Sequence, residues 1–154
     1  MPGPNSATGS IQTRIEGLSE DGRGVVDCDG KQYLVDNVIP GERIQFRSTG
    51  KRRGKHEGVV EQLIESSPMR VTPRCEHFGV CGGCSLQHIG TAHQVSIKQD
   101  RLLEQLSRVN VTAEALRAPI TGPVWGYRRK ARLGAKWVGK KDTALVGFRE
   151  RRNN

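Results

Sequence analysis

The chain has 154 residues, of which 34% are hydrophobic and only 5% aromatic. This composition disfavours one large core and favours small barrels with many turns. Lys and Arg together number 25 against 16 Asp and Glu, so the formal net charge is +9. A small protein this basic typically meets a polyanion, and nucleic acid is the first candidate.

Two classes of protein are disfavoured because long apolar runs are lacking. No run of apolar residues in the sequence reaches the roughly 18 that a membrane span needs. Residues 1–10 have neither the charged start nor the apolar stretch of a secretory signal. We therefore expect a cytoplasmic protein without a membrane partner. In that compartment, four cysteines indicate a metal or redox site rather than a disulfide framework.

A β-rich segment at 10–66 follows a tail at 1–9 that is rich in Pro and Gly and that we expect to be flexible. Within it, short runs of β-prone residues are separated by turn residues. The Asp29-Gly30 dipeptide favours a type I′ hairpin turn, which needs positive φ at both central residues. Five such runs predict five strands in a small closed or nearly closed barrel.

The remainder, residues 67–154, is expected to be a small α+β unit. Residues 91–109 have helical periodicity, and Thr91 with Gln94 fits a capping box at the start of the helix. Residues 127–138 and 143–148 predict two strands that pair across a turn at 139–142. Residues 67–90 contain too little apolar material to form a core, so something else must order them.

Cys75, Cys81 and Cys84 lie close together in the stretch CEHFGVCGGC. Thiolates are strong ligands for zinc and for iron–sulfur clusters, so a metal site is favoured over three free cysteines. A zinc ion would take a fourth ligand from a histidine (candidates: His77, His88 and His93), although zinc ribbons usually carry two C-x2-C pairs. The fourth cysteine, Cys28, lies in the β-rich segment and is interpreted as structural.

Two basic segments are candidates for contacts with nucleic acid. The first is a loop at 43–55 without acidic residues: Arg43, Arg47, Lys51, Arg52, Arg53 and Lys55. The second lies beside Trp125, Tyr127 and Phe148: Arg128, Arg129, Lys130, Arg132 and Arg149. Contacts with phosphates would be salt-sensitive and blind to sequence, while aromatic side chains suit unpaired bases. The alternatives are a solvated charged loop, and Trp125 and Tyr127 as core residues; Phe148 is expected to pack inside.

The order of these features resembles a known family. The stretches are VDNVIPGERI, then SSPMRVTPRCEHFGVCGGCSLQHI, then WGYRRKARL and VGFRERR. They are similar to the N-terminal part of the bacterial 23S rRNA (uracil-5-)-methyltransferases that carry a TRAM domain. The resemblance covers about residues 10–152.

The resemblance implies an OB-like TRAM barrel that binds RNA at 10–66, and a central iron–sulfur domain at 67–154. Cys75, Cys81 and Cys84 would hold a [4Fe–4S] cluster. The family's fourth cysteine follows soon after VGFRERR, beyond Asn154. The family's S-adenosylmethionine-binding domain, which methylates C5 of a uridine, would also lie beyond this sequence. No catalytic residue is therefore expected here, and the chain alone would be inactive.

The expected partner is 23S rRNA. We expect the chain to bind it as a monomer and to bind neither DNA nor a membrane. Two alternatives stay open. One is a stand-alone TRAM-type RNA-binding protein or RNA chaperone with a metal-stabilised cysteine cluster. The other is a zinc-dependent binding protein.

Overall fold

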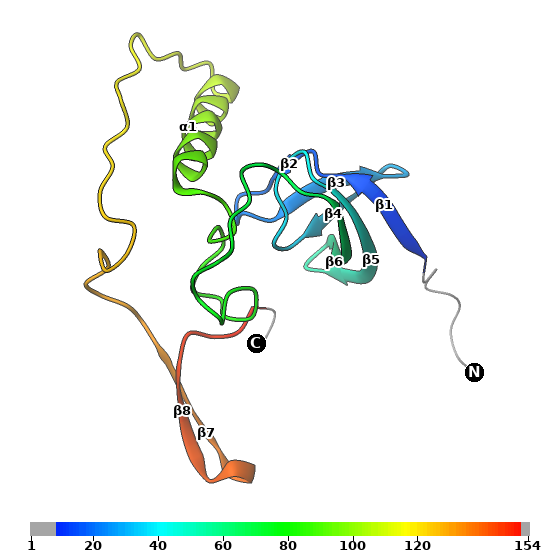
Figure 1. The fold of residues 1–154 in the computed structure, drawn as a ribbon, viewed down its shortest axis with the longest axis vertical. Coiled ribbons are helices and arrows are strands. Elements are labelled where there is room, and N and C mark those ends of the chain that lie inside the picture. Colours follow the sequence, from blue (N-terminus) through cyan, green and yellow to red (C-terminus); the bar gives the residue numbers. More distant parts are fainter. Residues whose placement is uncertain (1–8, 152–154) are drawn as a thin grey trace.

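A computed structural model describes residues 9–151 of the chain. Apart from Gly9, the tail expected at 1–9 lies outside the described residues. The described part is mainly β with one helix, as the sequence predicts. Figure 1 shows a curled sheet, a helix beside it, and a long extended segment that leads to a projecting hairpin.

The curled sheet has six strands rather than the predicted five. Its order is β1-β5-β6-β4-β3-β2, and β4 and β6 are its one parallel pair. The additional strand, β2, has only two residues and pairs with the start of β3, so it is too short to give an alternating pattern. The strands are β1 (Ser10–Arg14), β2 (Gly17–Leu18), β3 (Gly24–Cys28), β4 (Lys31–Val35), β5 (Arg43–Arg52) and β6 (Lys55–Glu65).

Two hairpins of this sheet, β3–β4 and β5–β6, are closed by two-residue turns. Asp29 and Gly30 have φ of 54° and 70°, which confirms the predicted turn between β3 and β4. Arg53 and Gly54, with φ of 51° and 80°, close β5 onto β6 in the same way. The basic stretch at 43–55 is therefore not a loop. Its side chains lie on a long hairpin, because cross-strand pairing continues to Arg52 and Lys55.

The core of the sheet is small and apolar. Phe46 is fully buried and its ring meets that of Tyr33 edge-on, with 5.3 Å between centroids. Gly58 makes room for Phe46, because a Cβ at this position would lie 2.4 Å from the ring. Cys28 packs against this core, and burial raises the pKa of its thiol, which supports a structural role. The buried cluster consists of Ile15, Val26, Tyr33, Val35, Val38, Ile44 and Phe46.

The helix α1 (Thr91–Arg108) lies outside the curled sheet. None of its 18 residues is buried. The predicted capping box is wrong: the N-cap is Gly90, and the Gln94 side chain instead donates to the carbonyls of Leu86 and Ile89, at 3.0 and 2.8 Å. Gln94 thereby ties the helix to the chain before it. Among the described residues, no helix has the length and hydrophobicity that crossing a membrane requires.

The second sheet is a hairpin of β7 (Gly134–Val138) and β8 (Thr143–Gly147), joined by a short 3-10 turn, η1 (Gly139–Lys141). Its pairing confirms the predicted turn at 139–142. The strand predicted for 127–133 is wrong, since these residues find no partner strand and run without regular structure. Arg128, Lys130 and Arg132 therefore do not lie on a strand.

A buried ion pair joins the curled sheet to residues 67–90, which we name the cysteine segment. Glu42 is fully buried, and Arg70 donates to its two carboxylate oxygens through Nε and Nη2, each at 2.6 Å. The backbone N–H groups of Ile39 and Ser67 also donate to the Glu42 carboxylate, at 2.9 and 3.2 Å. Burial alone raises the pKa of Glu42, but these hydrogen bonds outweigh it and hold the pKa below its ordinary value of 4.5.

We expect Glu42→Gln to lower the free energy of unfolding by about 3 kcal/mol at neutral pH, because it leaves Arg70 without its counterion in a largely buried site. Since folding lowers the pKa of Glu42, the pair stabilises the fold above pH 4.5 and is lost as the pH falls through the folded-state pKa. Urea unfolding of the variant should therefore depend less on pH in the acidic range than that of the wild type. The control is Glu65→Gln, which breaks exposed ion pairs. Equal losses in both variants would contradict this account.

Candidate nucleic-acid interface and metal centre

The three clustered cysteines lie in a tightly turned loop, the cysteine loop (residues 75–84). The N–H of Phe78 donates to the carbonyl of Cys75 at 3.0 Å, and that of Cys81 to the carbonyl of His77 at 2.9 Å. Gly79 has a φ of 92°, which a residue with a side chain rarely adopts. The N–H of Gly83 points at the sulfur of Cys81, 3.4 Å away, as backbone N–H groups do around metal-bound thiolates.

The three thiols do not converge in this structure. Within residues 9–151, no group of three or more His, Cys, Asp or Glu side chains is placed to hold a metal ion. His77 is exposed beside Glu76. His88 is buried, with Nε2 3.1 Å from the carbonyl of Val38, and burial lowers its pKa. The donor chemistry still fits zinc or iron–sulfur, so metal binding by Cys75, Cys81 and Cys84 stays a prediction.

The chain after β8 returns to the cysteine loop. The N–H of Gly82 donates to the carbonyl of Arg149 and the N–H of Arg151 to that of Val80, both at 2.8 Å. A Cβ at Gly82 would lie 2.7 Å from the Arg149 oxygen, so this approach requires glycine. Phe148, expected inside, packs beside Gly83 but remains 44% exposed because little else covers it.

Arg151 is a structural residue that the sequence did not single out. Its guanidinium lies 3.5 Å from Oδ1 of Asn37 and 3.9 Å from Asp36, and it also donates to the carbonyl of Cys84. It lies over the Phe78 ring, 5.8 Å from the centroid. Arg151 thus connects the returning chain, the cysteine loop and the turn after β4. In the sequence it is one of several arginines in a basic run, and no pattern distinguishes it.

The tip of the β5–β6 hairpin faces the cysteine segment across a cleft of about 470 Å³. Arg52, Arg53 and Lys55 line one side of this cleft, and Gly82 and Ser85 line the other. The cleft also contains acidic residues: Asp21, Asp36 and Glu57, with Arg23 paired to Glu57 at 2.9 Å and to Asp21 at 3.1 Å. We name Arg52, Arg53 and Lys55 the hairpin cations.

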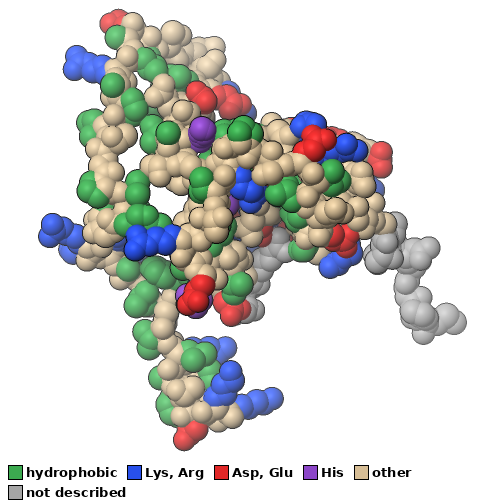
Figure 2. Space-filling model, in the orientation of Figure 1, with side chains coloured by type: hydrophobic (Ala, Val, Ile, Leu, Met, Phe, Trp, Pro, Cys, Tyr) green, Lys and Arg blue, Asp and Glu red, His purple; other side chains and the backbone are tan. Residues whose placement is uncertain are grey.

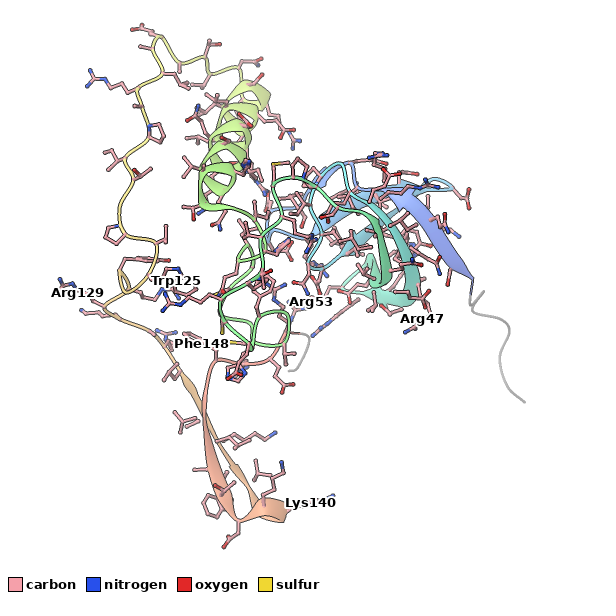
Figure 3. All side chains as sticks on the ribbon, in the orientation of Figure 1. Arg47, Arg53, Trp125, Arg129, Lys140 and Phe148 are labelled. Carbon is pink, nitrogen blue, oxygen red and sulfur yellow. The ribbon has the colours of Figure 1, made fainter. Side chains whose placement is uncertain are left out.

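The other cations of the first basic segment are placed differently. Arg43 pairs with Glu65 at 3.4 Å and Arg47 with Glu61 at 3.3 Å, across from β5 on β6. Lys51 lies opposite His56 in the hairpin. Figure 3 shows Arg47 on the side of the curled sheet away from Trp125 and Arg129. The six cations predicted to contact RNA therefore do not form one surface, because they are spread along the length of the β5–β6 hairpin.

The second basic segment lines a larger groove of about 850 Å³. We name it the tryptophan groove; its walls are the cysteine segment, the first two turns of α1 and residues 124–131. Arg128, Arg129 and Lys130 line it, whereas Arg132 and Arg149 are exposed outside it. Trp125 and Tyr127 remain 48% and 63% exposed, so the alternative that they are core residues is wrong. Figure 2 shows Lys and Arg side chains next to hydrophobic ones along this side of the molecule.

The cysteine segment lies between the two basic surfaces. Ser85 lines both the cleft and the tryptophan groove. Directly before it, Gly82 belongs to the cleft, whereas Gly83 and Cys84 belong to the groove. Whatever orders the cysteine loop therefore also sets the distance and angle between the hairpin cations and residues 124–131.

Comparisons with known proteins give the same family as the sequence motifs. The chain is 52% identical over 141 residues to the 23S rRNA (uracil(1939)-C(5))-methyltransferase RlmD of Alcanivorax borkumensis. Proteins of the same name from Alkalilimnicola ehrlichii and Legionella pneumophila (strain Lens) are 46% and 43% identical over 142 and 145 residues. These matches cover 91–94% of the chain.

The chain is a homologue of part of the 23S rRNA uracil-C5 methyltransferases. The resemblance stated from the motifs is thereby confirmed. The chain spans about a third of the length of these relatives, 32–33% in the three compared. No protein-family model matches it.

We expect Gly82→Ala to detach the returning chain from the cysteine loop, because the added Cβ would clash with the Arg149 carbonyl. Hydrogen–deuterium exchange should then speed up at the amides of Gly82 and Arg151 by roughly fivefold or more, since each loses a hydrogen bond worth about 1 kcal/mol. Exchange in the β5–β6 hairpin should not change. The control is Gly122→Ala, where no atom lies within 4 Å of the new Cβ. Unchanged exchange in Gly82→Ala would contradict the assigned contact.

Proposed function

We propose that this chain is the rRNA-recognition part of a 23S rRNA uracil-C5 methyltransferase. The observation that carries the proposal is its identity of up to 52% with relatives named for that rRNA. The geometry supports it, because two surfaces rich in Lys and Arg lie on either side of one ordered segment. Methyl transfer from S-adenosylmethionine is assigned to the part of the relatives that this chain does not match.

The curled sheet is the first RNA-binding element in this proposal. A small sheet that curls around one apolar core is the architecture of OB-like and TRAM barrels, and such barrels bind nucleic acid through strands and hairpins on one side. Here the hairpin cations project from the turn between β5 and β6. Their charges would lie along the phosphate backbone, which fixes position rather than sequence. A cytoplasmic monomer that prefers rRNA to DNA is part of the same proposal.

We further propose that Cys75, Cys81 and Cys84 bind a [4Fe–4S] cluster, with zinc as the alternative metal. Such a cluster supplies covalent cross-links within a segment that has little core of its own. The N–H of Gly83 already points at the sulfur of Cys81. The N–H of Arg151 donates a hydrogen bond to the carbonyl of Val80, so the chain at Arg151 lies beside the cysteine loop. A fourth ligand shortly after Arg151 would therefore be close to the three cysteines. The role assigned to the metal is to hold the cysteine segment between the two basic surfaces.

Neutralising the hairpin cations should weaken rRNA binding and make it less sensitive to salt. We expect the triple variant Arg52→Gln, Arg53→Gln, Lys55→Gln to lower the slope of log affinity against log salt by about one for each lost phosphate contact. Fluorescence anisotropy with a labelled 23S rRNA fragment at several KCl concentrations measures this slope. The control, Arg43→Gln with Arg47→Gln, removes cations of β5 that lie away from the hairpin tip and do not line the cleft, so it should change the slope less.

A larger effect in the control than in the triple variant would contradict the assigned surface. A wild-type chain that does not prefer the rRNA fragment to an unrelated RNA would contradict the proposed function. It would favour a general RNA-binding module or chaperone.

Removing one clustered cysteine should remove the metal. After anaerobic purification we expect iron matched by acid-labile sulfide in the wild type and a loss of most of it in Cys84→Ser. Cys28→Ser is the control, because Cys28 packs against the core of the curled sheet, and it should keep its iron. Zinc without sulfide would contradict the cluster in favour of the alternative. Full iron and sulfide in Cys84→Ser would contradict the ligand assignment.

A further inference from the structure

In the described part of the chain, the tryptophan groove is lined by positive charges alone, whereas the cleft beside the hairpin cations is lined by charges of both signs. Of the described residues that line the groove, five are Lys or Arg and none is acidic. The cleft, by comparison, contains three carboxylates among its cations. A groove lined by one sign of charge concentrates anions, so a polyanion is a better occupant than a polypeptide of mixed charge. The five cations are Arg74, Lys98, Arg128, Arg129 and Lys130.

The groove also offers aromatic faces that no protein core covers. The guanidinium carbon of Arg74 lies over the Trp125 ring, 5.0 Å from its centroid, while 48% of Trp125 remains exposed. Arg128 is placed similarly at Tyr127, at 5.9 Å. A planar cation behind an aromatic ring holds the ring in place and leaves the other face for a planar ligand. Figure 3 shows Trp125 on the side of its segment that faces the rest of the protein, with Arg129 pointing outward.

The groove is large enough for a nucleotide but is not a pocket for a small apolar ligand. Its volume of about 850 Å³ lies within the roughly 300–1,000 Å³ of ligand sites. Trp125 and Tyr127 in its wall remain exposed to solvent. Proteins bind single-stranded nucleic acid by combining Lys and Arg side chains, which contact the phosphate backbone, with aromatic rings, which stack on the bases. Paired bases could not reach Trp125, since their faces are stacked on each other.

We propose that the tryptophan groove binds an unpaired nucleotide of RNA, with its base stacked on Trp125 and the flanking phosphates along Arg128, Arg129 and Lys130. This inference rests on the proposed function, RNA binding, and gives it a second, base-dependent site beside the hairpin cations. The hairpin cations act on phosphates alone, whereas the groove distinguishes single-stranded from paired RNA.

The test compares two labelled oligomers of equal length and charge: oligoadenylate and an abasic ribose-phosphate chain. Fluorescence anisotropy measures the affinity of the purified chain for each. We expect Trp125→Ala to bind oligoadenylate roughly five- to a hundredfold more weakly, the usual loss for one stacked base, and the abasic chain with unchanged affinity. Trp125→Phe should restore most of the affinity for oligoadenylate, because it keeps a ring.

The chain provides a matched control in its other tryptophan. Trp137 lies on β7 outside the groove and is 62% exposed, so Trp137→Ala should bind both oligomers like the wild type. In a Trp137→Phe chain, Trp125 is the single tryptophan, and oligoadenylate should quench its emission while the abasic chain should not. Circular dichroism confirms that each variant is folded.

The outcomes separate the two proposals. A wild-type chain that binds neither oligomer nor the rRNA fragment contradicts the proposed function. A chain that binds both oligomers equally, with Trp125→Ala unaffected, contradicts the groove alone and leaves RNA binding to phosphates. A loss in Trp137→Ala as large as in Trp125→Ala also overturns the groove.

Discussion

The arrangement of the whole molecule depends on the ion pair of Glu42 and Arg70. Burying a carboxylate costs several kcal/mol, and here two hydrogen bonds from one guanidinium and two backbone N–H groups offset that cost. The pair holds the turn before β5 against the start of the cysteine segment. Arg70 also donates to the carbonyl of Asn37, and His88 reaches that of Val38, so three contacts fix one turn of the curled sheet.

Further hydrogen bonds connect this junction to parts of the chain that have no apolar core of their own. Gln94 ties α1 to the end of the cysteine segment, and Arg151 ties the returning chain to the turn after β4. The tryptophan groove is therefore positioned relative to the curled sheet, and so relative to the hairpin cations, through polar contacts. Such contacts define geometry but each contributes modestly to stability, so the metal proposed for the cysteine loop would have a clear physical role there.

Strands and turns with local causes could be predicted from the sequence. Asp29-Gly30 forms its turn because its own backbone preferences suffice, and Ile44 with Phe46 reaches the core because alternation reports burial. Features that depend on distant partners could not be predicted. Gln94 meets carbonyls rather than a helix cap, and residues 127–133 lack the partner that a strand needs. For the site, the cysteines and basic segments could be found as motifs, but the division of the first segment and the role of Arg151 follow only from tertiary contacts.

The central claim is that RNA meets this chain on both sides of the cysteine segment. Ultraviolet cross-linking of the chain to 23S rRNA, with the linked peptides identified by mass spectrometry, tests it most directly. The account predicts cross-links in peptides that contain residues 51–55 and residues 125–130, and their loss when unlabelled 23S rRNA competes. Cross-links confined to the strands that carry Arg14, Arg43 and Arg47, or a pattern that 23S rRNA does not compete away, would contradict it.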